Sequence, residues 1–191
     1  MGVTSADDEV ARRGLIAGDP SALESVTTKY WKRAVAYAWR LTDDRDVAED
    51  VSQLTFVRLW EGRSRLDPRG SLEPLIFRMV RNASLDYARR RSVRARHAKA
   101  HPEGGSVRTP ADMLEADELR LAVNHAINEL PTVRREVFLL ARHSGLTHRE
   151  IADLLGLAPQ TVANHLHLAL NDLRARLAHL LPPDYAPKPD R

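Results

Sequence analysis

The sequence contains no cysteine among its 191 residues, and no long apolar run. The first absence excludes a disulfide framework, a thiolate zinc site and a cysteine nucleophile, and it fits the reducing environment of the cytoplasm. No stretch approaches the roughly 18 continuous apolar residues that span a membrane. The opening MGVTSADDEVARR is acidic, where a signal peptide would have a basic start followed by an apolar segment. We therefore expect a cytoplasmic protein that does not insert into a membrane.

Motifs for catalysis are also missing. The eight histidines show no metal-binding spacing such as HExxH, and the chain has no glycine-rich phosphate loop. His165 and His167 stand two residues apart in an expected helix, so their side chains project in different directions and make a poor ligand pair. We predict no catalytic residue, no metal site and no cofactor, which argues against an enzyme.

The positive charge of the chain is concentrated. The net charge is only +3, yet the segment from Tyr87 to Pro102 holds six basic residues and no acid. These residues are Arg89, Arg90, Arg91, Arg94, Arg96 and Lys99. Such a cluster is typical of a surface that binds polyanions. The alternative is a solvated helix end, which is a common place for charges.

Apolar residues recur at helical spacing along most of the chain, and no run alternates as a strand would. Three such stripes fall between residues 18 and 96. Residues 97–114 carry two glycines and two prolines without any period, which indicates a flexible linker. Helical spacing resumes at 115–181, with breaks at Pro131 and Gly145. The predicted fold is all-α, with two small helical domains joined by that linker.

The stretch LTHREIADLLGLAPQTVANHL, from Leu146 to Leu166, has the sequence pattern of a helix-turn-helix. Thr147 and Glu150 form a capping box at the start of a helix. Gly156 suits the left-handed turn that ends it, and Pro159 suits the first turn of the next helix. The amides of Gln160 and Asn164 lie on the face opposite the apolar stripe, where they could pair with adenine. The alternative is a plain helical hairpin whose polar face serves solubility.

Four polar residues line one face of the predicted helix at 43–61, at steps of three and four: Asp46, Glu49, Asp50 and Gln53. Val47, Val51 and Leu54 are placed on the apolar face. An acidic face on a basic protein repels phosphate, so we expect it to bind protein instead. An ordinary solvated face remains the alternative.

The helix predicted from Ser71 onward presents a basic outward face and leads into the basic cluster. Arg78, Arg81, Asn82 and Arg89 lie on this face. Its arginines can hold phosphates, and Asn82 could bond a base edge. Only Phe77 and Tyr87 supply aromatic rings nearby, so we expect few bases to be held, mainly in a polar pocket.

Taken together, these residues resemble a bacterial RNA polymerase sigma factor of the extracytoplasmic-function group of the sigma-70 family. The resemblance covers about residues 22–177. DVAEDVSQLTFVRLW is similar to the segment that binds the polymerase, and LEPLIFRMVRNASLDYARRR is similar to the helix that recognises and opens the −10 promoter element. The resemblance implies that 18–96 is sigma region 2 and 115–181 is sigma region 4, which reads the −35 element. The implied partners are core RNA polymerase, through the β′ clamp helices and the β subunit, and promoter DNA. Many relatives are held inactive by an anti-sigma factor, and the sequence does not show whether this chain has one.

The resemblance also assigns residues to these roles. The polymerase-binding set is Asp46, Glu49, Asp50 and Gln53. The −10 set is Arg78, Arg81, Asn82, Arg89 and Arg90, with Asn82 at the pocket for a flipped non-template base. The −35 set is Thr147, Arg149, Gln160, Thr161, Ala163, Asn164, His165, His167 and Leu168.

The sequence departs from the family pattern at two places. Leu54 stands where an acid usually follows the glutamine of the polymerase-binding helix. The recognition helix has Ala163, His165, Leu168 and Leu170 where relatives commonly have lysine or arginine. We therefore expect weaker −35 recognition with a low salt dependence. The alternative function is a stand-alone LuxR-like helix-turn-helix regulator, which would require a sensing domain with strands in the amino-terminal half.

Overall fold

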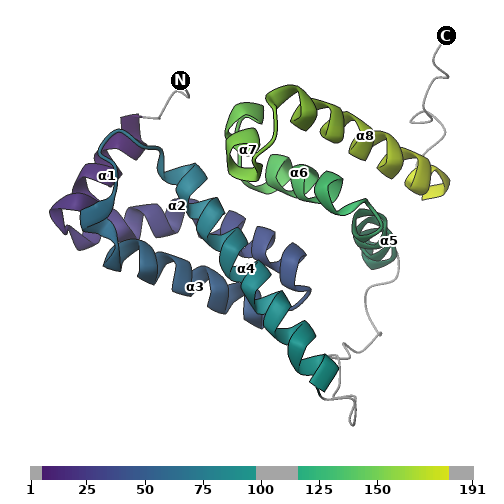
Figure 1. Cartoon of the computed structure of the whole chain (residues 1–191), viewed down its shortest axis with the longest axis horizontal. Helices are drawn as coiled ribbons and strands as arrows, with labels where there is room; N and C mark the ends of the chain where they lie inside the picture. The colour runs from purple at the N-terminus through teal and green to yellow at the C-terminus, as the bar shows by residue number, and fades with distance from the viewer. Residues whose placement is uncertain (1–5, 98–115, 181–191) are drawn as a thin grey trace.

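The computed structural model describes residues 6–97 and 116–180, and within these ranges all regular structure is helical (Figure 1). This confirms the all-α prediction. The first half contains α1 (Ala6–Ala17), α2 (Pro20–Thr42), α3 (Arg45–Glu61), the short 3-10 helix η1 (Arg63–Arg65) and α4 (Leu72–His97). The second half contains α5 (Ala116–Asn128), α6 (Thr132–His143), α7 (His148–Leu155), α8 (Pro159–Leu177) and the 3-10 helix η2 (Ala178–Leu180). Apart from His97, the predicted linker lies outside the described residues.

Three aspartates set both ends of α2 and the start of α3. Asp19 caps α2, accepting a hydrogen bond from the Ser21 backbone N–H at 2.9 Å, and Pro20 occupies the first turn. Asp43 ends the helix in the left-handed region at φ 55°, and its N–H donates to the Trp39 carbonyl. Asp44 then caps α3 by accepting from the Val47 N–H at 3.2 Å. The chain therefore reverses within two residues, and α3 packs along α2.

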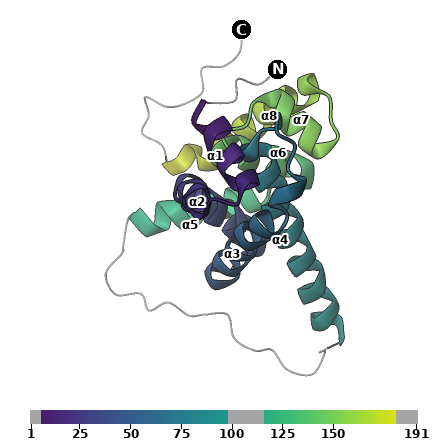
Figure 2. The same ribbon diagram turned by 90° about the vertical axis from the view of Figure 1, so that its left-hand side faces the viewer.

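The core of the first half is built around α2, which α1, α3 and α4 all contact. Its largest fully buried side chains include Tyr30, Tyr37, Leu59, Ile76 and Phe77. The Tyr37 and Phe77 rings meet edge to face with centroids 5.8 Å apart. Figure 2 shows α2, α3 and α4 crossing one another in this core.

Helix α1 was not predicted by the sequence analysis. It buries Leu15 against the core and is held to α2 by Asp8, whose carboxylate accepts from Tyr30 Oη at 2.8 Å and Lys29 Nζ at 2.5 Å. Asp8 and Arg12 are both only 4% exposed, so two of the buried positions of α1 carry charge. An apolar stripe is consequently weak in this segment, and the periodicity rule did not detect it.

The second half has the helix-turn-helix features predicted from the sequence. The Thr147 hydroxyl accepts from the Glu150 N–H at 3.3 Å, and the Glu150 carboxylate accepts from the Thr147 N–H at 2.9 Å, so the capping box is present. Gly156 ends α7 at φ 69°, and Pro159 begins α8. Val137, Ile151, Val162 and other buried residues join α6, α7 and α8 into one core.

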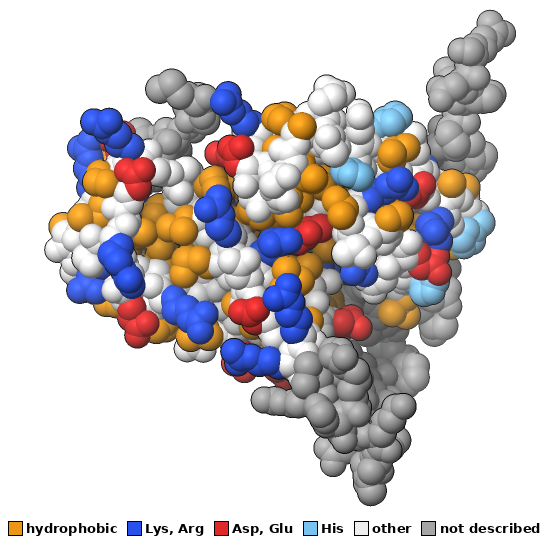
Figure 3. Space-filling view, viewed as in Figure 1, with side chains coloured by type: hydrophobic (Ala, Val, Ile, Leu, Met, Phe, Trp, Pro, Cys, Tyr) orange, Lys and Arg blue, Asp and Glu red, His pale blue; other side chains and the backbone are white. Residues whose placement is uncertain are grey.

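The two halves pack against each other, with α6 on α2 and α7 on α4. On the face drawn in Figure 3, Lys and Arg side chains alternate with Asp and Glu, and histidines gather over the second half. No helix in the described part of the chain is long and apolar enough to span a membrane.

Candidate nucleic-acid and protein interfaces

The acidic face of α3 is open to solvent. Asp46, Asp50 and Gln53 are exposed, and the Glu49 side chain is 46% exposed and accepts a hydrogen bond from Arg45 Nε at 3.1 Å. The opposite face packs into the core through Ala48, Val51 and other buried residues. The structure therefore places all four predicted residues on an accessible surface.

Two apolar residues border this acidic face and were not assigned to it. Leu54 is 42% exposed and Val57 is 46% exposed. The predicted position of Leu54 on the apolar face with Val51 is wrong, because Ser52, Thr55 and Phe56 take the buried positions instead. Leu54 and Val57 follow Asp50 and Gln53 at helical spacing, so charge and apolar area lie side by side. That spacing was the signal that could have identified them.

On α4, four of the five predicted DNA-binding residues are exposed: Arg78, Asn82, Arg89 and Arg90. The Arg89 guanidinium is only loosely paired, with Nη1 3.9 Å from Asp86 Oδ1 on the same helix. Arg91 is also exposed, whereas the side chains of Arg94, Arg96 and Lys99 lie outside the described residues. The visible part of the predicted basic surface is thus free to meet a polyanion.

Arg81 differs from its neighbours because it is engaged by the second half of the chain. Its Nε donates to the Glu136 carboxylate of α6, and the two side chains are 23% and 15% exposed. This hydrogen bond raises the pKa of Arg81 above its ordinary value. A predicted DNA-binding residue is therefore covered by an ion pair to Glu136, a partner that the sequence analysis did not identify.

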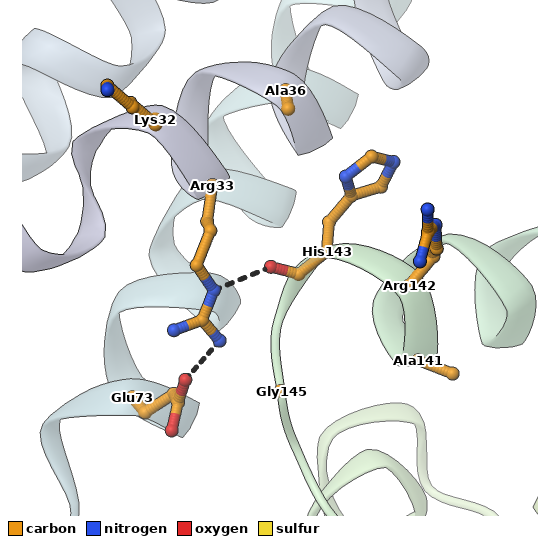
Figure 4. A pocket seen from close by; sticks show the side chains of 8 residues that line it. All are labelled: Lys32, Arg33, Ala36, Glu73, Ala141, Arg142, His143 and Gly145. Carbon is orange, nitrogen blue, oxygen red and sulfur yellow. Dashed lines mark hydrogen bonds and ion pairs between the residues drawn. The ribbon is translucent and has the colours of Figure 1, made fainter.

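A second contact joins the halves at Arg33 of α2 (Figure 4). Its Nε donates to the His143 carbonyl at 3.0 Å, and its Nη2 donates to the Ser144 carbonyl and the Glu73 carboxylate. Arg33, Glu73 and His143 line an open cavity of about 570 Å³ between the halves. Burial, together with the positive charges of Arg40 and Arg142, lowers the pKa of His143 to about 4, so this imidazole is neutral at pH 7.

The recognition helix α8 presents amides and histidines in place of cations. Gln160, Asn164, His167 and Leu168 are exposed, while Thr161, Ala163 and His165 are half-buried. Gln160 Nε2 donates to Asn164 Oδ1 at 3.1 Å, which orients both amides on the outer surface. On α7 and its cap, Arg149 is exposed and the Thr147 hydroxyl is used by the capping box.

The polymerase-binding set thus lies on α3, the −10 set on α4, and the −35 set on α8 and on α7 with its cap. The α3 and α4 sets belong to the first half of the described chain and the −35 set to the second, so the sets form separate surfaces. The arrangement suits a protein that contacts large partners over separate surfaces, since small-molecule sites are concave and enclosed.

Comparison with known proteins assigns both halves to one family. Residues 27–94 match sigma-70 region 2, and residues 120–173 match sigma-70 region 4. The ECF RNA polymerase sigma factor SigL of Mycobacterium tuberculosis is 29% identical over 170 residues, covering 87% of this chain and 95% of that protein. The ECF RNA polymerase sigma factor RpoE of Cereibacter sphaeroides is 30% identical over 137 residues, covering 69% and 72%.

Two solved structures share the fold. CnrH, in complex with the cytosolic domain of CnrY, has a TM-score of 0.70 and 23% identity, covering 91% of this chain and 98% of CnrH. The sigma factor RpoE of Bartonella quintana, in complex with the anti-sigma factor NepR, has a TM-score of 0.66 and 22% identity, covering 81% and 96%. With the region 2 and region 4 matches and the relatives above, the chain belongs to the extracytoplasmic-function group of the sigma-70 family of RNA polymerase sigma factors.

Proposed function

We propose that this sigma factor binds core RNA polymerase through the acidic face of α3 and directs it to specific promoters. The observation that carries the proposal is the exposed acidic surface at Asp46, Glu49 and Asp50, with Gln53 beside it, on a chain whose net charge is +3. Such a surface repels DNA and attracts a basic protein. Leu54 and Val57 add apolar area beside it, as expected at a protein interface.

The DNA contacts are assigned to α4 and α8. On α4, the exposed guanidinium groups hold phosphates of the −10 strand, and the amide of Asn82 meets a base edge. On α8, Gln160 and Asn164 read the −35 element. The segment from Ala158 to Leu173 contains no lysine or arginine, so this second contact neutralises few phosphates and depends weakly on salt.

Promoter opening requires the two halves to separate at Arg81. The Nε–H of Arg81 is bound to Glu136 and the side chain is only 23% exposed, so its access to a DNA phosphate is restricted in this arrangement. The CnrH and Bartonella RpoE structures are complexes with CnrY and NepR, and an anti-sigma partner that holds the closed arrangement is part of this proposal. The protein performs no reaction itself, since phosphodiester formation belongs to the polymerase, and it works in the cytoplasm with that enzyme.

The alternative of a LuxR-like regulator has less support. Within the described residues the first half is a helical domain without strands, whereas a receiver or ligand-sensing domain would need them. The match of residues 27–94 to sigma-70 region 2 favours the sigma-factor function over this alternative.

Run-off transcription with purified core polymerase tests the proposal. The double variant Asp46→Lys and Asp50→Lys should bind core polymerase at least about tenfold more weakly, because it replaces attraction with repulsion. Glu24→Lys, a reversal at an exposed position of α2, is the matched control and should leave binding unchanged. Equal losses in both would contradict the assigned surface.

A separate variant tests the assignment of α4 to the −10 element. Asn82→Ala should impair promoter opening, measured by permanganate reactivity of unpaired thymines, while its affinity for core polymerase stays at the wild-type level. Loss of opening and of polymerase affinity together would contradict the separation of roles between α3 and α4.

A further inference from the structure

A second, smaller hollow lies on the first half, away from the contact between the halves. Helix α1, the loop that contains η1 and the start of α4 enclose a cavity of about 390 Å³. Three arginines line it, Arg12, Arg65 and Arg78, together with a single carboxylate, Asp67. We call this the arginine hollow. Its charged lining is therefore positive on balance.

Arg12 is the unusual member of this lining. It is only 4% exposed, and its Nε and Nη1 atoms are buried without a hydrogen-bond partner among the described residues. A guanidinium stays protonated in proteins, so it cannot relieve this burial by losing its charge. An unpaired buried charge is costly, and its persistence calls for a specific reason.

The neighbouring carboxylates do not form an ion pair with Arg12 that would balance its charge. Asp8, one helical turn earlier, is engaged with Lys29 Nζ at 2.5 Å and with Tyr30 Oη. Asp67 uses Oδ1 to accept from the Arg69 backbone N–H at 2.9 Å, which shapes the loop. The positive charge of Arg12 is thus left available to a ligand in the hollow.

The other two arginines of the hollow are also available. Arg65 and Arg78 are exposed, and within the described part of the chain neither side chain makes a hydrogen bond or an ion pair. Arg63 on the same loop behaves differently, since its Nη1 donates to the Trp60 carbonyl at 2.8 Å and its guanidinium lies 4.3 Å from the Trp60 ring centroid. Among the described residues, Arg65 and Arg78 thus present unpaired guanidinium groups at the hollow.

We propose that the arginine hollow binds a phosphate group. Guanidinium groups present paired N–H donors that match phosphate oxygens, and three of them around one cavity suit a dianion or a phosphodiester. The phosphate can come from two sources, the backbone of a DNA strand that passes Arg78, or a free phosphate compound. The first source rests on the proposed function, because Arg78 also belongs to the −10 surface.

Binding of two probes to the full chain tests this assignment. The first probe is inorganic pyrophosphate, and the second is a single-stranded oligodeoxynucleotide of abasic sites, which offers backbone phosphates without bases. Arg12→Met should weaken binding of the true ligand by about 10- to 100-fold, as expected for loss of charge-assisted hydrogen bonds. Arg13→Met removes the same charge from the exposed neighbour, whose one ion pair among the described residues is with Glu9 on its own helix, and should have little effect.

The melting temperature supplies a readout that a purely structural role of Arg12 would not produce. Without phosphate, Arg12→Met should melt at or above the wild-type temperature, because it removes an unpaired buried charge. Added ligand should raise the melting temperature of the wild type and of Arg13→Met, but not of Arg12→Met. Should Arg12→Met fail to fold, the exposed pair Arg65→Gln and Arg69→Gln replaces it, with Arg69 as the control outside the hollow.

Each outcome decides the proposal. A selective loss of oligonucleotide binding supports a DNA phosphate, and a selective loss of pyrophosphate binding supports a free phosphate compound. Equal effects of Arg12→Met and Arg13→Met on both probes, or no binding of either probe by the wild type, would overturn it. Run-off transcription by the wild-type protein is measured alongside, so that failure of the hollow is distinguished from failure of the proposed function.

Discussion

Two glycines of the second half offer a matched test of the contact between the halves. Gly145 and Gly156 both have left-handed backbone, at φ 64° and 69°. A Cβ at Gly145 would lie 2.5 Å from Arg33 Nη2 and 3.2 Å from Glu73 Oε1, whereas a Cβ at Gly156 would meet nothing within 4 Å. Gly145→Ala and Gly156→Ala therefore share the free-energy cost of placing alanine in a left-handed conformation. Only Gly145→Ala also disturbs side chains of the first half.

The left-handed conformation costs an alanine about 1–2 kcal/mol, which both variants share. In Gly145→Ala the Arg33 guanidinium must move as well, and it loses its hydrogen bonds to the Ser144 carbonyl and Glu73. Hydrogen bonds to charged groups contribute about 1.5–3 kcal/mol, and the 36% exposure of the Arg33 side chain reduces this. We expect the contact to weaken by about 1–2 kcal/mol, a shift of about 5- to 30-fold between closed and open forms.

Because the sequence contains no cysteine, dyes can be attached only at cysteines that are introduced for the measurement of the closed fraction. Cysteines introduced at the exposed positions Ser25 of α2 and Ala175 of α8 carry a donor and an acceptor dye, and single-molecule energy transfer gives the closed fraction. Urea unfolding gives the shared loss of stability. Only Gly145→Ala should populate an open form. An equal closed fraction in the two glycine variants would refute the reasoning that Arg33 holds the halves together.

Three further predictions concern single interactions. Glu136→Gln should release Arg81 and raise the affinity for a single-stranded −10 probe. The control Glu129→Gln breaks an ion pair within the second half and should leave this affinity unchanged. Equal probe affinities of the two variants would contradict occlusion of Arg81 by Glu136. The depressed pKa of His143, about 4 against 6.5, means that stability is complete above pH 6.5 and declines as the pH falls toward 4. Urea midpoints of His143→Gln should lack this decline, and an identical pH profile would contradict it. Thr147→Ala should cost about 1 kcal/mol of unfolding free energy through the lost cap, while Thr147→Ser should retain it; equal losses would argue against the capping box.

Local structure was largely predictable from the sequence. The capping box of Thr147 and Glu150, the turn at Gly156 and the helix start at Pro159 were all predicted, and the structure confirms them. Each depends on groups no more than four residues apart, so the adjacent sequence is sufficient. The exposed acidic face of α3 was predicted for the same reason, because helical spacing alone puts its residues on one side.

The sequence by itself thus determined which segments from α2 onward are helical and which polar side chains share a face, but it did not reveal α1. Only the tertiary structure decided which of those side chains are free. Arg81 pairs with Glu136, which is 55 residues later in the sequence, and Arg33 donates to the carbonyl of His143, which is 110 residues later. Arg12 is buried without a partner because α1 packs against α2 and the η1 loop. The physical reason is that burial and ion pairing are set by segments remote in the chain, and spacing along one helix carries no information about its neighbours.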